Sequence, residues 1–596
     1  MQKSRNESIV YMSIAVTGIG IVSAIGVGVS ETLAALRSGS SGIGTMRHLA
    51  STHTELPVGE VKMSNDNMRQ RLGIASERQV SRTALLGAMA IKEAVAGRQL
   101  AGRCYVVSGT TVGGMDVTER IFKHIDDSDD MLRYISKHDC GSNTQEMAQL
   151  AGLDCEACTV STACSSALNA IMLGCEMLCN GEADVVIAGG TEALSLFHLN
   201  GFNSLMILDH ERCRPFDKMR AGLNLGEGAA YLVLQRTDDV DATEAKAYIT
   251  GYGNKCDAFH QTASSDNGEG AFLAMTEALR MAGLQPCDID YINAHGTGTP
   301  NNDASESAAL RRVFAECMPP VSSTKAYTGH TTSASGAIES VISIIAMMEN
   351  FLPANIGWSC QDEDCIAPYA SGMEGKEKAL RHVLCNSFGF GGNDSSMVIS
   401  RQPSSSSSVL VNAGEVQASC QVVSDITIDD ESQLAEAKEY IPPMQARRMG
   451  KLMKAATLTS LKALREAGTD CPDAIITATA YGMLETSERF LRDMVENGEQ
   501  GLSPTLFMQS THNTIGSQIA IRTKCHGYNI TYSQGAQSLE WALRDARRLI
   551  ATGKAETVLV GCHDEATPTF RSIMQRMGAS VPPAIFSRSI VLKKKK

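Results

Sequence analysis

The sequence predicts an α/β protein built from two related regions, and three observations support this prediction. Short apolar stretches alternate with helical patterns over roughly the first four hundred residues, which is typical of α/β folds. A proline and a run of serines, residues 403–408, then mark a flexible boundary. The residues after this boundary repeat parts of the pattern before it. A chain of 596 residues is long enough for two such regions, each with its own core.

The strands of the first region are expected where short apolar runs end in glycine or in a polar loop. The predicted strands are residues 185–189, 229–234, 248–253, 291–294, 383–390 and 397–399. Helical periodicity predicts helices near residues 165–180, 270–282 and 305–315. Because strands and helices alternate, we expect mostly covered sheets.

Composition and charge exclude several classes of function. The chain is 43% hydrophobic and 20% charged, as soluble globular proteins are. Its net charge of −13 argues against a nucleic-acid partner. The apolar stretch 14–29 is interrupted by glycines, so no membrane span is expected. The 18 cysteines form no disulfide framework and no zinc-type cluster, which predicts reduced thiols, no metal and a cytoplasmic location.

Cys164 lies in the run Ser-Thr-Ala-Cys-Ser-Ser, between strand residues 158–160 and a helical pattern. A thiol at a helix start meets backbone N–H groups that have no partner inside the helix. The positive end of the helix dipole favours the thiolate, and small neighbours leave room for a thioester. The alternative at this point is a buried, inert cysteine.

Three glycine-rich loops follow Cys164 along the chain. Residues 293–300 contain His295, residues 325–330 end in His330, and residues 386–393 contain Phe390. Ligand sites gather outside the carboxyl ends of strands in α/β sheets, so three strand-end loops predict one shared site. One thiol and two histidines are the groups that thioester chemistry needs, because the thiol can take up an acyl group covalently.

In their residues and in their order along the chain, these motifs resemble those of the β-ketoacyl-[acyl-carrier-protein] synthases of the thiolase-like superfamily. The resemblance runs over residues 13–401 and includes segments 214–218, 225–228 and 257–260. It implies a thiolase-like layered αβαβα fold and a decarboxylative Claisen condensation of an acyl thioester with malonyl-acyl carrier protein. The pathway implied is fatty-acid synthesis or aryl polyene/flexirubin-type polyketide synthesis. The substrates would travel on the phosphopantetheine arm of acyl carrier protein, without a further cofactor, and the synthase would form a homodimer or heterodimer.

The resemblance also implies a role for each matching residue. Cys164 would be the nucleophile, while His295 and His330 would hydrogen-bond the malonyl carbonyl. Backbone N–H groups of Cys164 and Phe390 would form an oxyanion hole, with the Phe390 side chain as a gate. The supporting residues would be Lys325 and Glu339, with Thr297 and Thr299 along the malonyl arm. The alternative for Lys325 and Glu339 is a surface charge, and for Phe390 it is core packing. For Thr297 and Thr299 the alternative is turn formation.

The second region, residues 409–596, follows a linker at 402–408 and repeats part of the first. Residues 475–479 match 106–110, and residues 553–561 match 181–189. This alignment places Ala536 opposite Cys164, so the copy lacks the nucleophile. The region resembles a β-ketoacyl-synthase N-terminal-like domain, a partial thiolase-like α/β domain that is non-catalytic. By analogy with chain-length factors, it would shape the acyl tunnel. The alternative is that the two regions are not related and merely share the same alternation of helices and strands.

Two other functions compete with the condensing enzyme. The chain could be a non-catalytic, chain-length-factor-like partner of another synthase, or a degradative thiolase. Thiolases use a second cysteine late in the chain, where this sequence has a histidine loop. Cys164, His295 and His330 are all intact, which favours the synthase.

Overall fold

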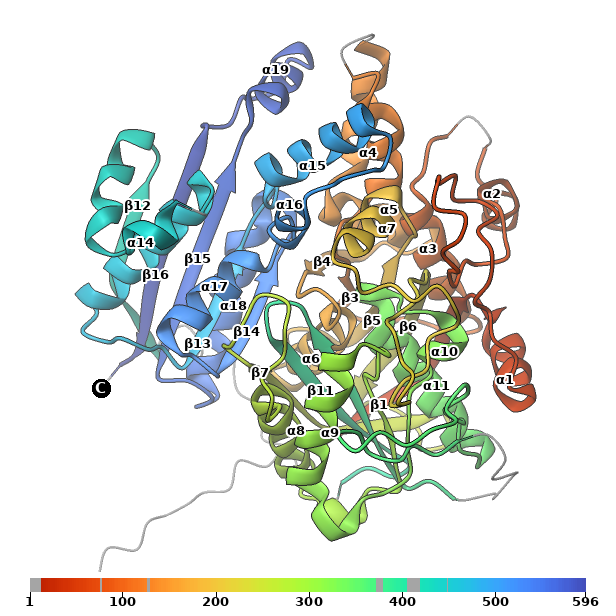
Figure 1. Ribbon diagram of the computed structural model, residues 1–596. Helices are drawn as coiled ribbons and strands as arrows, with labels where there is room; N and C mark the ends of the chain where they lie inside the picture. Colours follow the sequence, from red (N-terminus) through yellow and green to blue (C-terminus); the bar gives the residue numbers. More distant parts are fainter. Residues whose placement is uncertain are drawn as a thin grey trace, which may run out of the picture.

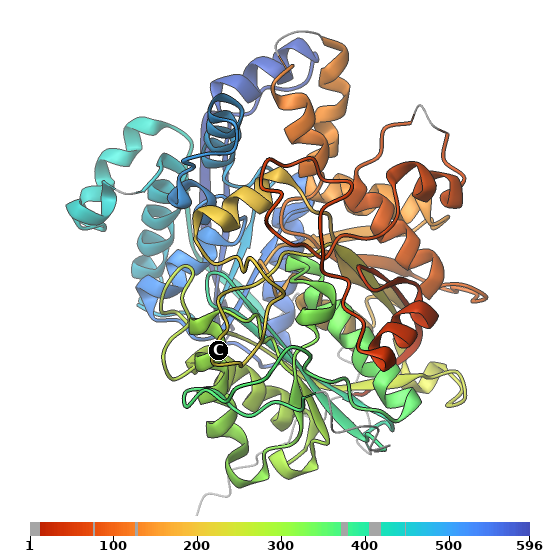
Figure 2. The same cartoon turned by 45° about the vertical axis from the view of Figure 1, so that its right-hand side comes forward.

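A single sheet path runs through the whole molecule in the computed structural model. The residues described are 12–75, 78–125, 129–370, 379–404, 419–447 and 449–595. The strand order is β12-β16-β15-β13-β14-β4-β3-β5-β6-β1-β7-β11-β10-β8-β9, with β2 paired to β1 at the side. The second region, blue in Figure 1, stands beside the first, and Figure 2 shows the same arrangement after a 45° turn.

The first region contains two five-stranded halves that meet at β1 and β7. The strands of its N-terminal half are β4 (Glu156–Val160), β3 (Cys104–Gly109), β5 (Val185–Glu192), β6 (Gly228–Arg236) and β1 (Ile14–Ser23), with β2 (Gly26–Val27) beside β1. The strands of its C-terminal half are β7 (Ala247–Cys256), β11 (Asn393–Ser400), β10 (His382–Gly389), β8 (Tyr291–Asn293) and β9 (Val321–Ser322). The halves pair antiparallel at residues 14–16 and 247–249.

Helices complete five layers around these two half-sheets. The central layer is α6 (Ser166–Cys179) and α11 (Ser335–Glu349), which contact each other and both half-sheets. Both helices are apolar almost all round, as helices buried on every side are. The outer helices are α3 (Arg82–Ala94) and α5 (Cys140–Leu150) on one face, and α8 (Glu269–Ala282) and α9 (Pro300–Phe314) on the other. The predicted αβαβα layering is confirmed.

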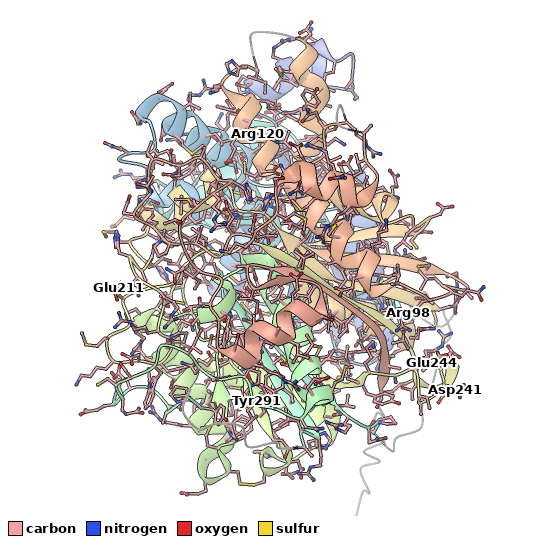
Figure 3. The ribbon with its side chains drawn as sticks, turned by 90° about the vertical axis from the view of Figure 1, so that its right-hand side faces the viewer. Arg98, Arg120, Glu211, Asp241, Glu244 and Tyr291 are labelled. Atoms are coloured by element: carbon pink, nitrogen blue, oxygen red, sulfur yellow. A yellow bond between two sulfur atoms is a disulfide. The ribbon has the colours of Figure 1, made fainter. Side chains whose placement is uncertain are left out.

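The remaining helices of the first region cover its edges and loops. They are α1 (Val29–Ser38), α2 (Asn65–Leu72), α4 (Met115–Phe122), α7 (Leu196–Ser204) and α10 (Lys325–Thr328). Charged side chains such as Glu211, Asp241 and Glu244 lie exposed at the periphery, as Figure 3 shows.

The second region is one five-stranded half of the same design. Its strands are β12 (Cys420–Ile428), β16 (Ile585–Lys594), β15 (Thr557–Glu565), β13 (Ala474–Ala478) and β14 (Tyr528–Tyr532). Its helices are α13 (Pro443–Ala446), α14 (Lys451–Glu466), α15 (Leu484–Asn497), α16 (Pro504–Met508), α17 (Thr514–Thr523), α18 (Ser538–Ala551) and α19 (Pro568–Arg576). β13 is parallel to β14 and β15, as β3 is to β4 and β5, so the predicted second α/β unit is present.

The two regions join across a local pseudo-two-fold axis between β4 and β14. Val160 faces Tyr532 in an antiparallel pair. Ser161 N–H donates to Thr531 O (2.9 Å), and Ser533 N–H donates to Thr159 O (3.0 Å). Each contact is the other's equivalent after an offset of 372 residues (533 − 161 = 531 − 159). This self-complementary exchange is what a two-fold interface requires, here within one chain.

The predicted strands and helices lie close to their observed positions, with one clear difference. The helix expected from residue 305 starts at Pro300, because proline fits the first turn of a helix, where its missing N–H costs nothing. Most of the predicted linker, residues 405–408, lies outside the described residues. The region boundaries 13–401 and 409–596 therefore stay predictions.

The expectation of uniformly reduced cysteines is wrong at one pair. Cys287 and Cys317 form a disulfide with a Cα–Cα distance of 5.1 Å, while the other cysteines are free. No sequence motif marks this pair, because the partners are 30 residues apart and lie in two short helical turns, residues 286–288 and 315–317. Within the described ranges, no helix is long and apolar enough to cross a bilayer.

Candidate active site

Cys164 lies in a tight turn between β4 and α6. The preceding residue, Ala163, has a left-handed φ of 52°, which folds the thiol back over the helix start. Ser166 fixes this turn: its hydroxyl accepts from Thr162 N–H (2.8 Å) and donates to Ala163 O (2.6 Å). The thiol is 5% exposed, so the turn presents it to an enclosed space.

The backbone N–H groups near Cys164 favour the thiolate, but burial outweighs their effect in the resting site. Burial raises the pKa of Cys164 to about 12, although Lys325 and the backbone N–H groups of Phe390 and Cys164 oppose the rise. Desolvation disfavours the charged thiolate more than these groups favour it. The thiol therefore needs a neighbouring base, and His330 Nε2 lies 3.0 Å from Cys164 Sγ.

The three glycine loops converge as predicted, because β8, β9 and β10 are parallel neighbours. Their carboxyl ends share one edge of the sheet, and the loops of His295, His330 and Phe390 follow these ends. The rings of His295 and His330 are 5.3 Å apart, with an angle of 82° between their planes. Both imidazoles are buried, and burial together with the Lys325 charge holds their pKa values well below the ordinary range. Both are neutral near pH 7.

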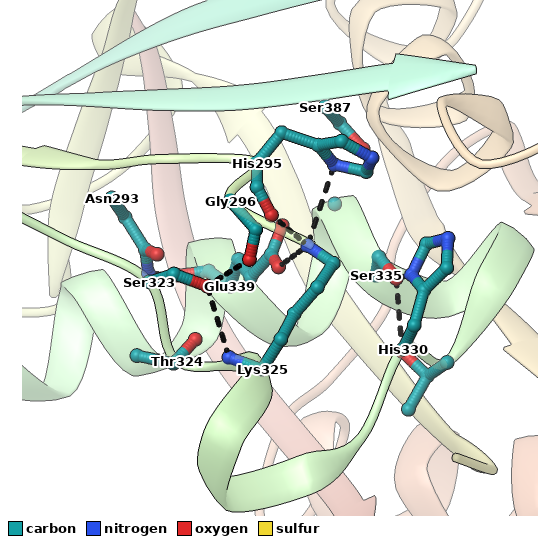
Figure 4. A network of polar contacts seen from close by, with 12 residues as sticks. Asn293, His295, Gly296, Ser323, Thr324, Lys325, His330, Ser335, Glu339 and Ser387 are labelled. Carbon is teal, nitrogen blue, oxygen red and sulfur yellow. Dashed lines mark hydrogen bonds and ion pairs between the residues drawn. The ribbon is translucent and has the colours of Figure 1, made fainter. Parts of the chain in front are cut away.

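Lys325 and Glu339 form a buried ion pair behind His295 (Figure 4). The Lys325 ammonium donates to His295 O (2.6 Å) and lies 3.3 Å from His295 Nδ1. Because the ammonium is only a donor, Nδ1 must accept, which leaves the proton on Nε2. Burial raises the pKa of Glu339 to about 7, and Lys325 opposes that rise. The pair holds His295 in one tautomer and is not a solvated surface charge.

His330 is held by Ser335 at the start of α11 (Figure 4). Its Nδ1 lies 3.1 Å from Ser335 Oγ. A hydroxyl donates or accepts, so either neutral tautomer of His330 is satisfied. His330 can thus accept a proton at Nε2 in one step and donate from the same atom in another.

Phe390 follows β10 and lines the same cavity as Cys164 and the two histidines. Its backbone N–H lies near the Cys164 thiol and lowers the pKa of that thiol, as does the N–H of Cys164 itself. Its ring stacks on Phe202, with centroids 5.7 Å apart and planes 19° apart. The loop lies close to the nucleophile's turn, since a Cβ at Gly389 would meet Thr162 O at 2.6 Å.

A cavity of about 360 Å³ opens from this site toward the surface. The thiol, both histidines and Phe390 line its inner end. Thr297 and Thr299, whose hydroxyls lie 2.9 Å apart, also line this cavity. Cavities of this size bind small molecules or flexible arms.

A small apolar pocket lies on the other side of Cys164 and Phe390, and the second region forms part of it. Val112, Phe197 and Phe202 of the first region line it together with Phe507 and Thr511 of the second. Phe507 packs on Phe202 at a centroid distance of 5.3 Å. The second region therefore reaches the nucleophile's immediate surroundings.

Glu306 is a site residue that the sequence did not reveal. Its buried carboxylate accepts from the N–H groups of His295 (2.9 Å) and Gly296 (2.8 Å), and so it holds the first histidine loop. Asn386 also donates to it (3.1 Å). Glu306 sits mid-helix in α9 with no motif around it, so only the packing of α9 under the loop identifies it.

The second region has a turn equivalent to that of Cys164. Gly535 has φ 55°, close to the 52° of Ala163, and Ser538 makes the two hydrogen bonds that Ser166 makes. Ala536 occupies the nucleophile's place, as the alignment predicted. The helices that follow, α6 and α18, have 14 residues each.

Comparison with known families agrees with this geometry. The family described as "Beta-ketoacyl synthase, N-terminal domain" matches residues 12–240, and "Beta-ketoacyl synthase, C-terminal domain" matches residues 246–359. A second N-terminal-domain family of the same description matches residues 421–591. Residues 421–591 and 12–240 thus both match N-terminal domains of this kind, which agrees with the internal repeat seen in the sequence.

Individual relatives give the same result. The chain is 30% identical over 420 residues to the 3-oxoacyl-[acyl-carrier-protein] synthase 2 of Vibrio cholerae, covering 65% of this chain and 99% of that protein. The solved ishigamide ketosynthase/chain length factor is 29% identical with a TM-score of 0.61, covering 65% of this chain and 99% of that one. The PfaC keto synthase–chain length factor shares the fold over 98% of this chain and 78% of its own, with TM-score 0.76 and 17% identity.

Proposed function

The chain belongs to the β-ketoacyl synthase family, and from this premise we propose how its residues carry out decarboxylative condensation. The reaction joins an acyl thioester to malonyl-acyl carrier protein and lengthens the acyl chain by two carbons. The observation that carries the proposal is the enclosed set of Cys164, His330 and His295, with His330 Nε2 3.0 Å from the thiol.

In the first step Cys164 takes the acyl group from its carrier. His330 accepts the thiol proton at Nε2, and the thiolate attacks the thioester carbonyl. Negative charge develops on the carbonyl oxygen, where the N–H groups of Cys164 and Phe390 converge. The carrier's thiolate then leaves and takes the proton from His330, so the acyl group remains on Cys164.

In the second step malonyl-acyl carrier protein enters by the cavity that Thr297 and Thr299 line. Neutral His295 and His330 donate from Nε2 to the malonyl thioester carbonyl. As carbon dioxide leaves, the electron pair moves onto that oxygen as an enolate, which the two donors stabilise. The carbanion attacks the acyl carbonyl on Cys164 and expels the thiolate, which yields the β-ketoacyl product. Lys325 and Glu339 act by orienting His295.

The second region, in this proposal, shapes the acyl side of the site. A further cavity of about 300 Å³ lies between the regions, with apolar walls from Phe122 and Ile125 on one side and Leu491 and Ile573 on the other. Thr511 lines the small pocket beside Cys164, and the next residue, His512, lines this cavity. An acyl chain growing past Phe507 would enter it, as the analogy with chain-length factors suggests.

The partner and location follow the same reasoning. The substrates arrive on the phosphopantetheine arm of acyl carrier protein, and the chemistry above requires no metal or redox group. A cytoplasmic location and dimerisation with another synthase-like subunit stay predictions. The region boundaries 13–401 and 409–596 are proposed as the functional units.

The test uses the full-length protein with malonyl-carrier protein and acyl-carrier proteins of graded length. We expect an acyl adduct on the Cys164 peptide by mass spectrometry and a carrier-bound product two carbons longer. No adduct and no product with any primer would contradict the proposal. Product formation only after another synthase is added would favour a non-catalytic, chain-length-factor-like role.

A further inference from the structure

Asn513 of the second region reaches the loop that carries Phe390 in the first. It lies directly before α17 and is fully buried, with 0% of its surface exposed. Its amide nitrogen donates to Phe390 O (2.8 Å) and to Asn393 Oδ1 (2.7 Å). These acceptors belong to the first residue of the loop and to the first residue of β11, so one side chain spans the loop.

The loop needs such an anchor because its backbone is unusually free. Gly391 and Gly392 both have left-handed φ values, 89° and 75°, and glycine restricts the chain less than any other residue. Helix α17 lies directly against it, since a Cβ at Gly391 would come 2.0 Å from Ser517 Oγ. The contact with the second region therefore selects one loop conformation.

Phe390 N–H and Phe390 C=O belong to the two peptide groups on either side of one Cα. A hydrogen bond that fixes the carbonyl also restricts the N–H, which lies near the Cys164 thiol. We propose that Asn513 is a positioning residue for condensation, which the second region supplies to hold the Phe390 peptide in the oxyanion hole. This inference rests on the proposed function. It makes the second region part of the active site's support as well as a wall of the acyl pocket.

The substitution Asn513→Asp separates this role from simple packing. It keeps the size of the side chain but replaces the donating amide by a carboxylate that faces two oxygen acceptors. The loop must then move away from its anchor. Loss of one oxyanion donor lowers rates by about 10²–10³-fold, so partial misplacement is expected to slow transfer onto Cys164 by roughly 10- to 100-fold.

Malonyl decarboxylation provides the internal comparison. It depends on His295 and His330, whose loops make no hydrogen bond with Asn513 among the contacts of the described residues. We therefore expect decarboxylation without a primer to stay within about threefold of wild type in Asn513→Asp. A variant that merely unfolds would lose both activities together.

The experiment measures acyl transfer to Cys164, decarboxylation and the unfolding midpoint in wild type, Asn513→Asp and Asn513→Ala. Asn180→Ala is the matched control, because Asn180 is also buried and donates to one backbone carbonyl, Glu176 O (2.7 Å), far from the loop. Slow acyl transfer with intact decarboxylation in the Asn513 variants alone supports the inference. Acyl transfer within twofold of the control, or parallel loss of both activities, overturns it. If wild type itself fails to condense any primer, the proposed function fails and not this inference.

Discussion

The turn of Cys164 and the turn of Ala536 have nearly the same backbone conformation, yet only the first has a thiol that could react. Both contain a left-handed residue, a serine that makes the same two hydrogen bonds, and a 14-residue helix. Behind both lies a carboxyl group, buried in Glu192 and half-buried in Asp564: Glu192 accepts from Thr111 N–H (2.6 Å), and Asp564 accepts from Ala480 N–H (2.8 Å). The second turn keeps the backbone conformation and the serine hydrogen bonds of the first, but it has Ala536 in place of the cysteine.

The difference lies in what each turn faces. The turn of Cys164 faces the loops of His295, His330 and Phe390, all of which come from the C-terminal half of the first region. The described residues of the second region, 419–447 and 449–595, include no counterpart of that half. Under the proposed function, the groups that act on the substrate beside Cys164 therefore come from the C-terminal half of the first region.

Moving the cysteine from the first turn to the second tests this comparison most directly and has the largest expected effect. In Cys164→Ala we expect condensation to fall by at least about 10³-fold, because no acyl-enzyme can form, while malonyl decarboxylation continues. Adding Ala536→Cys to that variant should restore nothing, since the loops of His295 and His330 lie at Cys164 instead. Product analysis by mass spectrometry measures both. Full condensation by Cys164→Ala, or rescue by the second change, would contradict the assignment.

Phe507 tests whether the second region contributes to the first region's pocket. Phe507→Ala removes a ring packed against Phe197, Phe202 and Phe490, which should cost about 3–5 kcal/mol of unfolding free energy. It also opens the small pocket, so we expect longer acyl chains in the products. Phe314→Ala, in the core of the C-terminal half, is the control for stability. Equal product lengths in both variants would argue against a shared pocket.

The carboxyl groups of Glu192 and Asp564 should give the two regions different pH profiles of stability. Burial raises the pKa of Glu192 to about 7 and that of Asp564 to about 6. Because each folded pKa exceeds the unfolded one, each protonated group stabilises the fold at low pH, and this is lost as pH rises through the folded pKa. Glu192→Gln should flatten the fall in stability between about pH 4.5 and 7, and Asp564→Asn between about pH 4 and 6, by on the order of 2 kcal/mol each. Denaturant unfolding across this range measures the slopes; unchanged slopes would refute the assignment.

The smallest expected effect is on stability and concerns Gly535, the left-handed residue of the second region's turn. Alanine occupies this position in the first region, and a Cβ at Gly535 would have its nearest neighbour, Asp139 Oδ2, at 3.7 Å. Gly535→Ala should therefore change stability by no more than about 1 kcal/mol, since strain and reduced unfolded-state entropy oppose each other. Gly535→Val should cost clearly more, because a branched Cβ fits this conformation poorly. Equal costs in thermal unfolding would show that the turns differ more than their dihedral angles suggest.

Much of the fold and site followed from local sequence patterns. Apolar runs ending in glycine loops located the strands before His295 and Phe390, and parallel pairing of β8, β9 and β10 brought these loops together. The duplication was visible because glycines and apolar runs recur at the same spacing. These features depend on short segments, which a sequence shows directly.

Other features depend on packing between distant segments. Glu306 reaches the histidine loop only because α9 lies beneath it, and Asn513 reaches Phe390 only because the second region docks there. The high pKa of Cys164 also follows from burial, which outweighs the helix start that the sequence revealed. No motif marks these residues, so three-dimensional placement is needed to find them.

The exchange of hydrogen bonds between β4 and β14 joins two parts of one chain, with β11 ending at Ser400 and β12 beginning at Cys420. Short connections give tethered partners an effective concentration in the millimolar range. Separate subunits with the same contacts would come apart on dilution, whereas these stay paired at any enzyme concentration. Damage to this interface should thus appear as lower stability that does not depend on protein concentration.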